Sequence, residues 1–214
     1  MKRCLVIGFV FVLSVGAWAQ IHVGLTSDFQ DGTTMGWSGP NVAHTPTGGP
    51  NGSGDAFITV TADGSGQGGA LATYNTGDWL GNYQAAGVDR ITMMLSNFNA
   101  VPLEIRVVLF DGVTHARWTS VTPATLAANS GWTLATFSLA EADLVRVQGS
   151  SNYSGVITNV ERLMIRHDAG NPSAGGTSIV GSMGIDRIQA VPEPASLAVL
   201  GLGWVAMRRR RKLA

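Results

Sequence analysis

The segment 103–109 constrains the fold more than any other part of the chain, because its apolar residues recur at every second position. One face of an extended backbone here carries only aliphatic side chains, those of Leu103, Ile105, Val107 and Leu109. Glu104 and Arg106 fall on the opposite face, where we expect a surface ion pair. A period of two is typical of a half-buried β-strand, so the segment predicts a strand with one face in a hydrophobic core.

Similar short apolar runs recur along the chain, at 58–60, 91–95, 132–134, 163–165 and 185–188. Between them, the segments 38–54 and 170–182 are rich in Gly, Pro, Asn and Ser and are expected to be long surface loops. Only residues 139–147 have a helical pattern, short enough to be a single turn between strands. About nine short strands favour one all-β domain, an antiparallel β-sandwich or barrel, with Trp37 and Trp132 in its core.

The first nineteen residues have the three parts of a secretory signal peptide. Lys2 and Arg3 are followed by an apolar run at 5–15 and by Ala17-Trp18-Ala19, which places cleavage before Gln20. The pattern predicts export through the secretory translocon and removal of residues 1–19 by signal peptidase. An uncleaved N-terminal anchor is the alternative, but the run is shorter than the roughly 20 residues that span a bilayer.

The last 24 residues have a different composition from the rest of the chain. Val191-Pro192-Glu193-Pro194 precedes an apolar stretch, 195–207, and a basic cluster, 208–212. We expect the stretch to form a short transmembrane helix, although thirteen residues reach only about 20 Å of the ~30 Å hydrocarbon core. The basic cluster favours the cytoplasmic side of the membrane. The stretch 195–207 could serve as a transient membrane anchor, and the alternative is a permanent single-pass anchor.

The ordered arrangement of Pro-Glu-Pro, apolar helix and arginine cluster resembles the PEP-CTERM sorting tail. The resemblance implies that a membrane-embedded exosortase processes the chain, after transient anchoring in the inner membrane, and leaves it on the cell surface or outside the cell. By resemblance, the residues recognised are Pro192, Glu193, Pro194, Arg208, Arg209, Arg210 and Arg211. The chain then divides into a signal peptide (1–19), an ectodomain (20–190) and a sorting tail (191–214).

The charge of the ectodomain excludes some partners. Residues 20–190 contain seven arginines, no lysine and thirteen carboxylates, so their net charge is 7 − 13 = −6. Nucleic-acid binding is not expected, because it needs a basic surface. Cys4 is the only cysteine and lies in the signal peptide, so disulfides cannot stabilise the mature chain.

Two segments of the ectodomain resemble galactose-binding-like jelly rolls, a group that includes many carbohydrate-binding modules. Ser27 to Thr33, followed by Gly36-Trp37, is similar to their first strand and loop, and Gly184 to Ile188 is similar to their closing strand. The resemblance implies a jelly-roll sandwich and a structural Ca²⁺ ion. The candidate ligands are Asp28, Asp31, Asp55 and Asp186. Gln30 stands where an acidic residue is common, and solvated turn aspartates are the alternative.

Sugar binding requires exposed aromatic rings and a few polar groups that fix the hydroxyls. The candidates are Trp79, Tyr83, Arg117 and Trp118, with Tyr153, Arg106 and Asn152 as further possibilities. Arg117 and Trp118 fall on opposite faces of one predicted strand, so only one of them is exposed. The alternative is that most of the tryptophans belong to the core.

No catalytic constellation is visible in the sequence. The ectodomain glutamates, Glu104, Glu141 and Glu161, lie in no recognisable motif, whereas a glycosidase needs two opposed carboxylates. We therefore expect a non-enzymatic protein of the cell envelope or extracellular matrix that associates with exopolysaccharide or another glycan. A structural or adhesive surface protein without a specific glycan is the alternative, and a hydrolase is the least favoured class.

Overall fold

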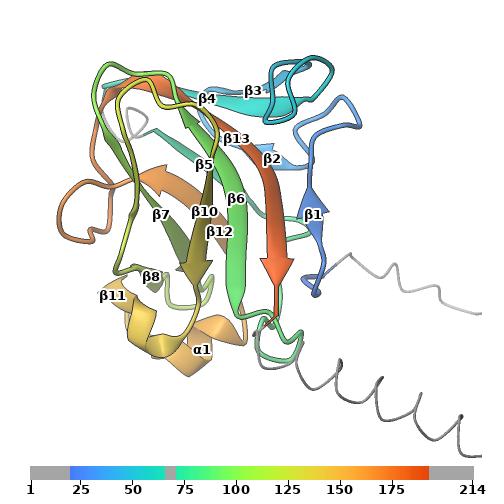
Figure 1. The fold of residues 1–214 in the computed structure, drawn as a ribbon. Coiled ribbons are helices and arrows are strands. Elements are labelled where there is room, and N and C mark those ends of the chain that lie inside the picture. Colours follow the sequence, from blue (N-terminus) through green and yellow to red (C-terminus); the bar gives the residue numbers. More distant parts are fainter. Residues whose placement is uncertain (1–19, 66–70, 193–214) are drawn as a thin grey trace, which may run out of the picture.

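Two antiparallel β-sheets pack face to face in the computed structural model, which describes residues 20–65 and 71–192 (Figure 1). The six-stranded sheet has the order β10-β6-β13-β4-β3, with β1 paired to β13. Its strands are β1 (Thr26–Ser27), β3 (Val42–Thr45), β4 (Phe57–Asp63), β6 (Arg90–Asn97), β10 (Thr133–Ser138) and β13 (Val180–Val191).

The seven-stranded sheet has the order β11-β8-β7-β12-β5-β2, with β9 paired to β7. Its strands are β2 (Trp37–Ser38), β5 (Ala72–Asn75), β7 (Leu103–Phe110), β8 (Arg117–Ser120), β9 (Ala124–Leu126), β11 (Leu144–Gln148) and β12 (Arg162–His167). The predicted all-β sandwich is therefore confirmed. The ends of the chain, with the predicted signal peptide 1–19, Glu193, Pro194, the apolar stretch 195–207 and the cluster 208–212, lie outside the described residues.

The core forms between the sheets from the alternating aliphatic positions. The four residues of β7 that share one face are fully buried, as are the inward residues of β6, β4 and β12. In β13, Ile185 and Ile188 are both buried although they are three residues apart. A register shift between Asp186 and Gln189, with Arg187 at φ 50°, makes this possible, because a bulge returns the strand to the same face after an extra residue.

The single turn expected within residues 139–147 is present as a 3₁₀ turn, η2 (Glu141–Asp143), before β11. The one α-helix in the described part of the chain, α1 (Tyr153–Ile157), was not predicted. The two expected long loops need correction. The segment 38–54 is interrupted by β3, and 170–182 ends in the first residues of β13. No helix within residues 20–65 and 71–192 is long and apolar enough to cross a membrane.

Trp37 is buried in the core as predicted, but Trp132 is not a core residue. Trp132 lies half-buried on the outer face of the six-stranded sheet, with its ring edge-on to Phe57 at 5.1 Å. Its indole N–H donates to the carbonyl of Gly48 at 3.0 Å. The residue immediately precedes β10, so the alternation of that strand does not fix its direction.

Candidate functional site

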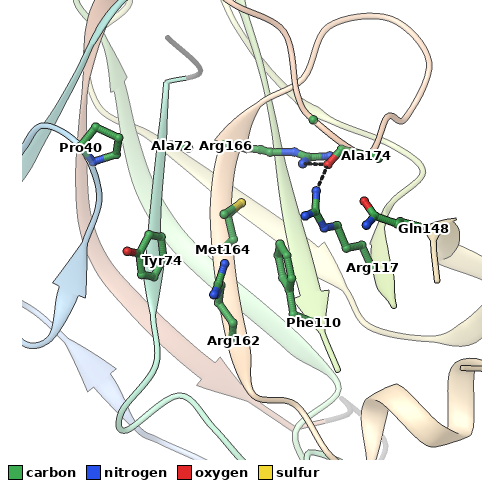
Figure 2. A pocket seen from close by; sticks show the side chains of 11 residues that line it. Pro40, Ala72, Tyr74, Phe110, Arg117, Gln148, Arg162, Met164, Arg166 and Ala174 are labelled. Atoms are coloured by element: carbon green, nitrogen blue, oxygen red, sulfur yellow. Dashed lines mark hydrogen bonds between the residues drawn. The ribbon is translucent and has the colours of Figure 1, made fainter. Parts of the chain in front are cut away.

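A pocket of about 560 Å³ lies on the outer face of the seven-stranded sheet, in the size range of ligand sites (Figure 2). Strands β5, β12, β7, β8 and β11 form its floor, and the loop after β12 forms one wall. The lining residues are Pro40, Ala72, Tyr74, Phe110, Arg117, Gln148, Arg162, Met164, Arg166, Ala174 and Gly175. Most come from outward positions of the strands, whose inward neighbours build the core.

Aromatic rings and guanidinium groups alternate across the floor of this pocket, in the order Tyr74, Arg162, Phe110, Arg117 (Figure 2). The Arg162 guanidinium lies 4.9 Å from the ring centres of both Tyr74 and Phe110. The Arg117 guanidinium lies 5.0 Å from the Phe110 ring. Strand register explains the row, because Arg162 is directly opposite Phe110 and Phe110 is directly opposite Arg117. We call these four residues the stacked row.

The two arginines of the stacked row have hydrogen-bonding capacity to spare. Among the described residues, neither Arg117 nor Arg162 has a carboxylate as an ion-pair partner. The Nε atoms of both side chains are buried without a hydrogen-bond partner in the described chain. Burial lowers the pKa of Arg117, and the nearby positive charge of Arg162 lowers it further. Both facts favour a negatively charged or strongly accepting group in the pocket.

A buried charge network supports one end of the pocket. Arg106 and Arg166 are only 1% and 2% exposed, and both lie against Asp168, which is fully buried. Nη2 of Arg166 donates to Oδ2 of Asp168 at 3.0 Å, and Nε of Arg106 is 4.0 Å from the same oxygen. The predicted surface ion pair between Glu104 and Arg106 is wrong, because the outer face of β7 is covered here.

The loop that covers it, residues 168–179, is held by these same arginines. Arg106 donates to the carbonyl of Gly170 at 2.5 Å, and Arg166 donates to the carbonyl of Ser173. Arg166 and Arg117 both donate to the carbonyl of Ala174, at 2.9 and 2.6 Å (Figure 2). The loop wall of the pocket is therefore fixed to its floor.

Of the four predicted glycan-contacting residues, only Arg117 lines the pocket. Trp79 and Tyr83 are 0% exposed, so their predicted role at a sugar surface is wrong. Trp118 points to the inner side of β8, where it packs on the core beside Tyr153 with ring centres 5.9 Å apart. Of the two alternatives for β8, the structure therefore has Trp118 facing the core and Arg117 facing outward.

The other candidates from the sequence also lie elsewhere. Tyr153 donates to the carbonyl of Leu139, and Asn152 caps α1 by accepting from the N–H of Gly155 at 2.9 Å. Sequence reasoning missed Arg162, Met164 and Arg166 as pocket residues. Their positions could have been found from the alternation in β12, because the residues between them, Leu163 and Ile165, are buried and face the core.

Three of the four residues predicted to bind calcium, Asp28, Asp55 and Asp186, lie together where β13 passes the start of β4. The guanidinium of Arg187 lies 3.7 Å from Oδ2 of Asp55 and 3.8 Å from Oδ2 of Asp186. Burial raises the pKa of Asp186 to about 6, and the charges of Asp55 and Asp28 contribute to the rise. Asp31 does not join them, because its carboxylate is exposed and accepts hydrogen bonds from Thr33.

Gln30 occupies the centre of this cluster. Its Nε2 lies 3.0 Å from the carbonyl of Asp28, 3.1 Å from Oδ1 of Asp55 and 3.3 Å from the carbonyl of Ala56. An amide nitrogen has two hydrogens and here meets three acceptors. Oδ2 of Asp186 has no hydrogen-bond partner among the described residues. Within that part of the chain, no three acidic or histidine side chains converge as a ready-made metal site, so a cation here would depend on backbone and amide oxygens.

Comparisons with known proteins bear on the tail and on the fold. Residues 190–212 match the family described as the PEP-CTERM protein-sorting motif. This motif indicates an exported protein that is sorted to the cell surface, and it implies processing by an exosortase. A search with the sequence found no curated protein that matches it.

Solved structures similar to this chain include domains of carbohydrate-active proteins. An exo-β-agarase is 12% identical, with a TM-score of 0.52 over 78% of this chain and 25% of its own. A family 11 carbohydrate-binding module from Clostridium thermocellum, in complex with a β-1,3-1,4-mixed-linked tetrasaccharide, is 16% identical, with a TM-score of 0.47 over 80% of this chain and 98% of its own. The chain spans about a quarter of the agarase. The agarase match, whose TM-score is above 0.5, shows that this two-sheet fold also occurs as a domain of a solved structure.

Proposed function

We propose that this protein binds a polysaccharide outside the cell, without catalysis, through the pocket on its seven-stranded sheet. The observation that carries the proposal is the stacked row, which places aromatic rings and hydrogen-bond donors side by side in a concave surface. The C–H groups on the face of a pyranose ring pack on an aromatic ring. The hydroxyl groups at the edge of the pyranose accept hydrogen bonds from protein donors. Tyr74 supplies the first kind of contact, and Arg117, Arg162 and Gln148 supply the second.

A binding role fits the lining of this pocket better than a hydrolytic one. None of the eleven described lining residues is Asp or Glu. Glycoside hydrolysis uses two carboxylates on either side of the scissile bond. The arginines would fix a chain in place, but they offer neither a general acid of suitable pKa nor a carboxylate nucleophile.

We infer that the ends of the chain deliver this domain to its ligand. The signal peptide directs export, the apolar stretch 195–207 holds the protein in the inner membrane until exosortase acts, and the ectodomain then joins the exopolysaccharide at the surface. The match at 190–212 supports the sorting step. Cell fractionation of a strain in which Pro192, Glu193 and Pro194 are all replaced by Ala tests the rest, since retention of the protein in the inner membrane is expected.

Replacing Tyr74 by Ala is expected to weaken polysaccharide binding about fivefold, because a stacking surface worth about 1 kcal/mol is lost. Affinity electrophoresis of the full chain through gels that contain individual soluble polysaccharides measures this. The matched control is Phe98→Ala, which removes an exposed aromatic ring from the opposite sheet. Equal retardation of the two variants would place the glycan site elsewhere, and no retardation by any polysaccharide would favour a purely structural role.

We also propose that the cluster around Asp186 binds Ca²⁺. The three oxygens that crowd Nε2 of Gln30, together with Oδ2 of Asp186, are ligands of the type this ion prefers. Rotation of the amide would present Oε1 of Gln30 instead, and the exposed side chain of Arg187 would leave. Asp28 through its carbonyl, Gln30, Asp55 and Asp186 would then hold the ion and fix the first loop to the last strand.

The pKa of Asp186 gives this site a predictable pH dependence. Its value in the folded protein, about 6, exceeds the ordinary 3.8, so the folded state holds the proton more tightly than the unfolded chain. In chelator, stability should therefore fall as the pH rises from about 4 to 6, by about 1–3 kcal/mol. Ca²⁺ should restore the melting temperature at neutral pH and have little effect below about pH 5.

Differential scanning fluorimetry with Ca²⁺ or EDTA measures both effects. Asp186→Asn should abolish the response to Ca²⁺ and the fall with pH, whereas Asp31→Asn should leave both unchanged. A wild-type melting temperature that is the same in Ca²⁺ and EDTA at neutral pH would contradict the calcium proposal.

A further inference from the structure

The pocket concentrates positive charge on a domain that is otherwise acidic. Three of the seven arginines in residues 20–190 line it, namely Arg117, Arg162 and Arg166, and no described lining residue is acidic. The net charge of the same segment is −6. A neutral sugar needs hydrogen-bond donors, but it does not require unbalanced cations gathered in one place.

Only two of these arginines have charge available for a ligand. The charge of Arg166 is balanced by Asp168 at 3.0 Å, and its N–H groups serve the loop carbonyls. Arg162 makes no side-chain hydrogen bond or ion pair with any described residue, and Arg117 makes one hydrogen bond, to the carbonyl of Ala174. The guanidinium groups of both residues also pack against the ring of Phe110.

Contact with an aromatic ring prepares a guanidinium group for an anion. A side chain packed against a ring loses part of its freedom before the ligand arrives, while its N–H edge remains able to form two parallel hydrogen bonds with one carboxylate or sulfate. Arg162 is packed in this way on two rings, Tyr74 and Phe110, each 4.9 Å away. The two guanidinium groups lie on either side of the Phe110 ring, so they offer two separate positions for anionic groups of one polymer.

We propose that the polysaccharide recognised by this pocket is acidic, and that Arg117 and Arg162 bind its anionic substituents. The inference rests on the proposed function and adds the ligand class to it. Carboxylate and sulfate groups share the necessary chemistry. The negative charge of the remaining surface repels polyanions, so their binding would depend on this pocket rather than on a diffuse basic patch.

Paired polymers that differ only in charge test the proposal. We would measure binding of the full chain, in mild detergent, to polygalacturonate and to its fully methyl-esterified form, and to dextran sulfate and dextran. We expect binding to at least one charged polymer, at least tenfold weaker binding to its neutral partner, and loss of affinity as salt is raised. Comparison of the polygalacturonate pair with the dextran pair shows whether the pocket prefers carboxylate or sulfate groups.

Arginine variants locate the contact. Arg117→Gln and Arg162→Gln should each reduce affinity for the charged polymer roughly 10- to 100-fold, the size expected for a hydrogen bond to a charged group. Arg90→Gln, on the opposite sheet, is the control and should bind as the wild type. Arg162→Lys, which keeps the charge but not the planar group, should lose only part of the affinity. This variant keeps the proposal testable if Arg162→Gln fails to fold.

Each outcome has a distinct meaning. Equal binding of charged and neutral polymers, with loss in Tyr74→Ala, would overturn the acidic ligand and leave the proposed glycan function intact. Preference for the charged polymer that neither arginine variant alters would overturn the assignment to this pocket. Failure to bind any of the four, and any of the panel used for Tyr74→Ala, would overturn the acidic ligand together with the glycan function.

Discussion

Replacing Asp168 by Asn is expected to lower the free energy of unfolding by about 3–5 kcal/mol, the usual cost of removing one partner from a buried ion pair. Asp168 is fully buried and faces two buried arginines, Arg106 and Arg166. It also accepts hydrogen bonds from the hydroxyl of Ser173 at 2.6 Å and from its backbone N–H at 3.0 Å. The Asn amide would point N–H groups at guanidinium N–H groups, and both positive charges would lose their counterion.

Urea denaturation followed by tryptophan fluorescence measures this loss. The matched control is Asp89→Asn, because Asp89 pairs with Arg90 at 3.6 Å with more than a quarter of each side chain exposed. An exposed pair of this kind is worth about 1 kcal/mol or less. If the two variants lose equal amounts, the network around Asp168 does not stabilise the fold in the way its burial indicates.

Much of the fold could be predicted from sequence because strand alternation is a local property. The aliphatic face of β7 follows from residues 103–109 alone, and its burial is confirmed. Trp79 and Tyr83 could not be placed in this way, because residues 76–88 form no named strand and give no alternation to interpret. Burial raises the pKa of Tyr83, consistent with a hydroxyl that donates inside the protein, to the carbonyl of Trp79.

The pocket was only partly predictable from sequence, because its residues become neighbours only through the pairing register of separate strands. Tyr74, Phe110 and Arg162 come from three strands, and they become neighbours only once β12 has paired with β5 on one side and β7 on the other. Nothing near Arg162 in the sequence indicates Phe110. Arg106 shows the same limit. An outward charged residue of a strand is normally solvated, but here the distant loop 168–179 and the end of β8 bury it.

The second large effect is expected at Ser27, where one hydroxyl serves two tryptophans. The indole N–H groups of Trp37 and Trp79 both donate to Oγ of Ser27, at 3.1 and 3.0 Å. All three residues are buried, and the two rings lie 5.8 Å apart. A serine oxygen has two lone pairs, so the arrangement satisfies both donors. Each buried polar group left without a partner costs about 1–3 kcal/mol, so Ser27→Ala should lower the free energy of unfolding by about 2–6 kcal/mol.

A double-mutant cycle separates this cause from simple loss of volume. In a Trp37→Phe, Trp79→Phe background neither ring has an N–H to satisfy, so Ser27→Ala should cost less than about 1 kcal/mol there. The comparison is made within that background, which removes the cavity effects of the phenylalanines from the difference. The same cost in both backgrounds would mean that Ser27 acts through packing alone. A reduced cost would show that the Ser27 hydroxyl stabilises the fold by accepting the hydrogen bonds of the two buried indoles, and so attaches β1 to the core.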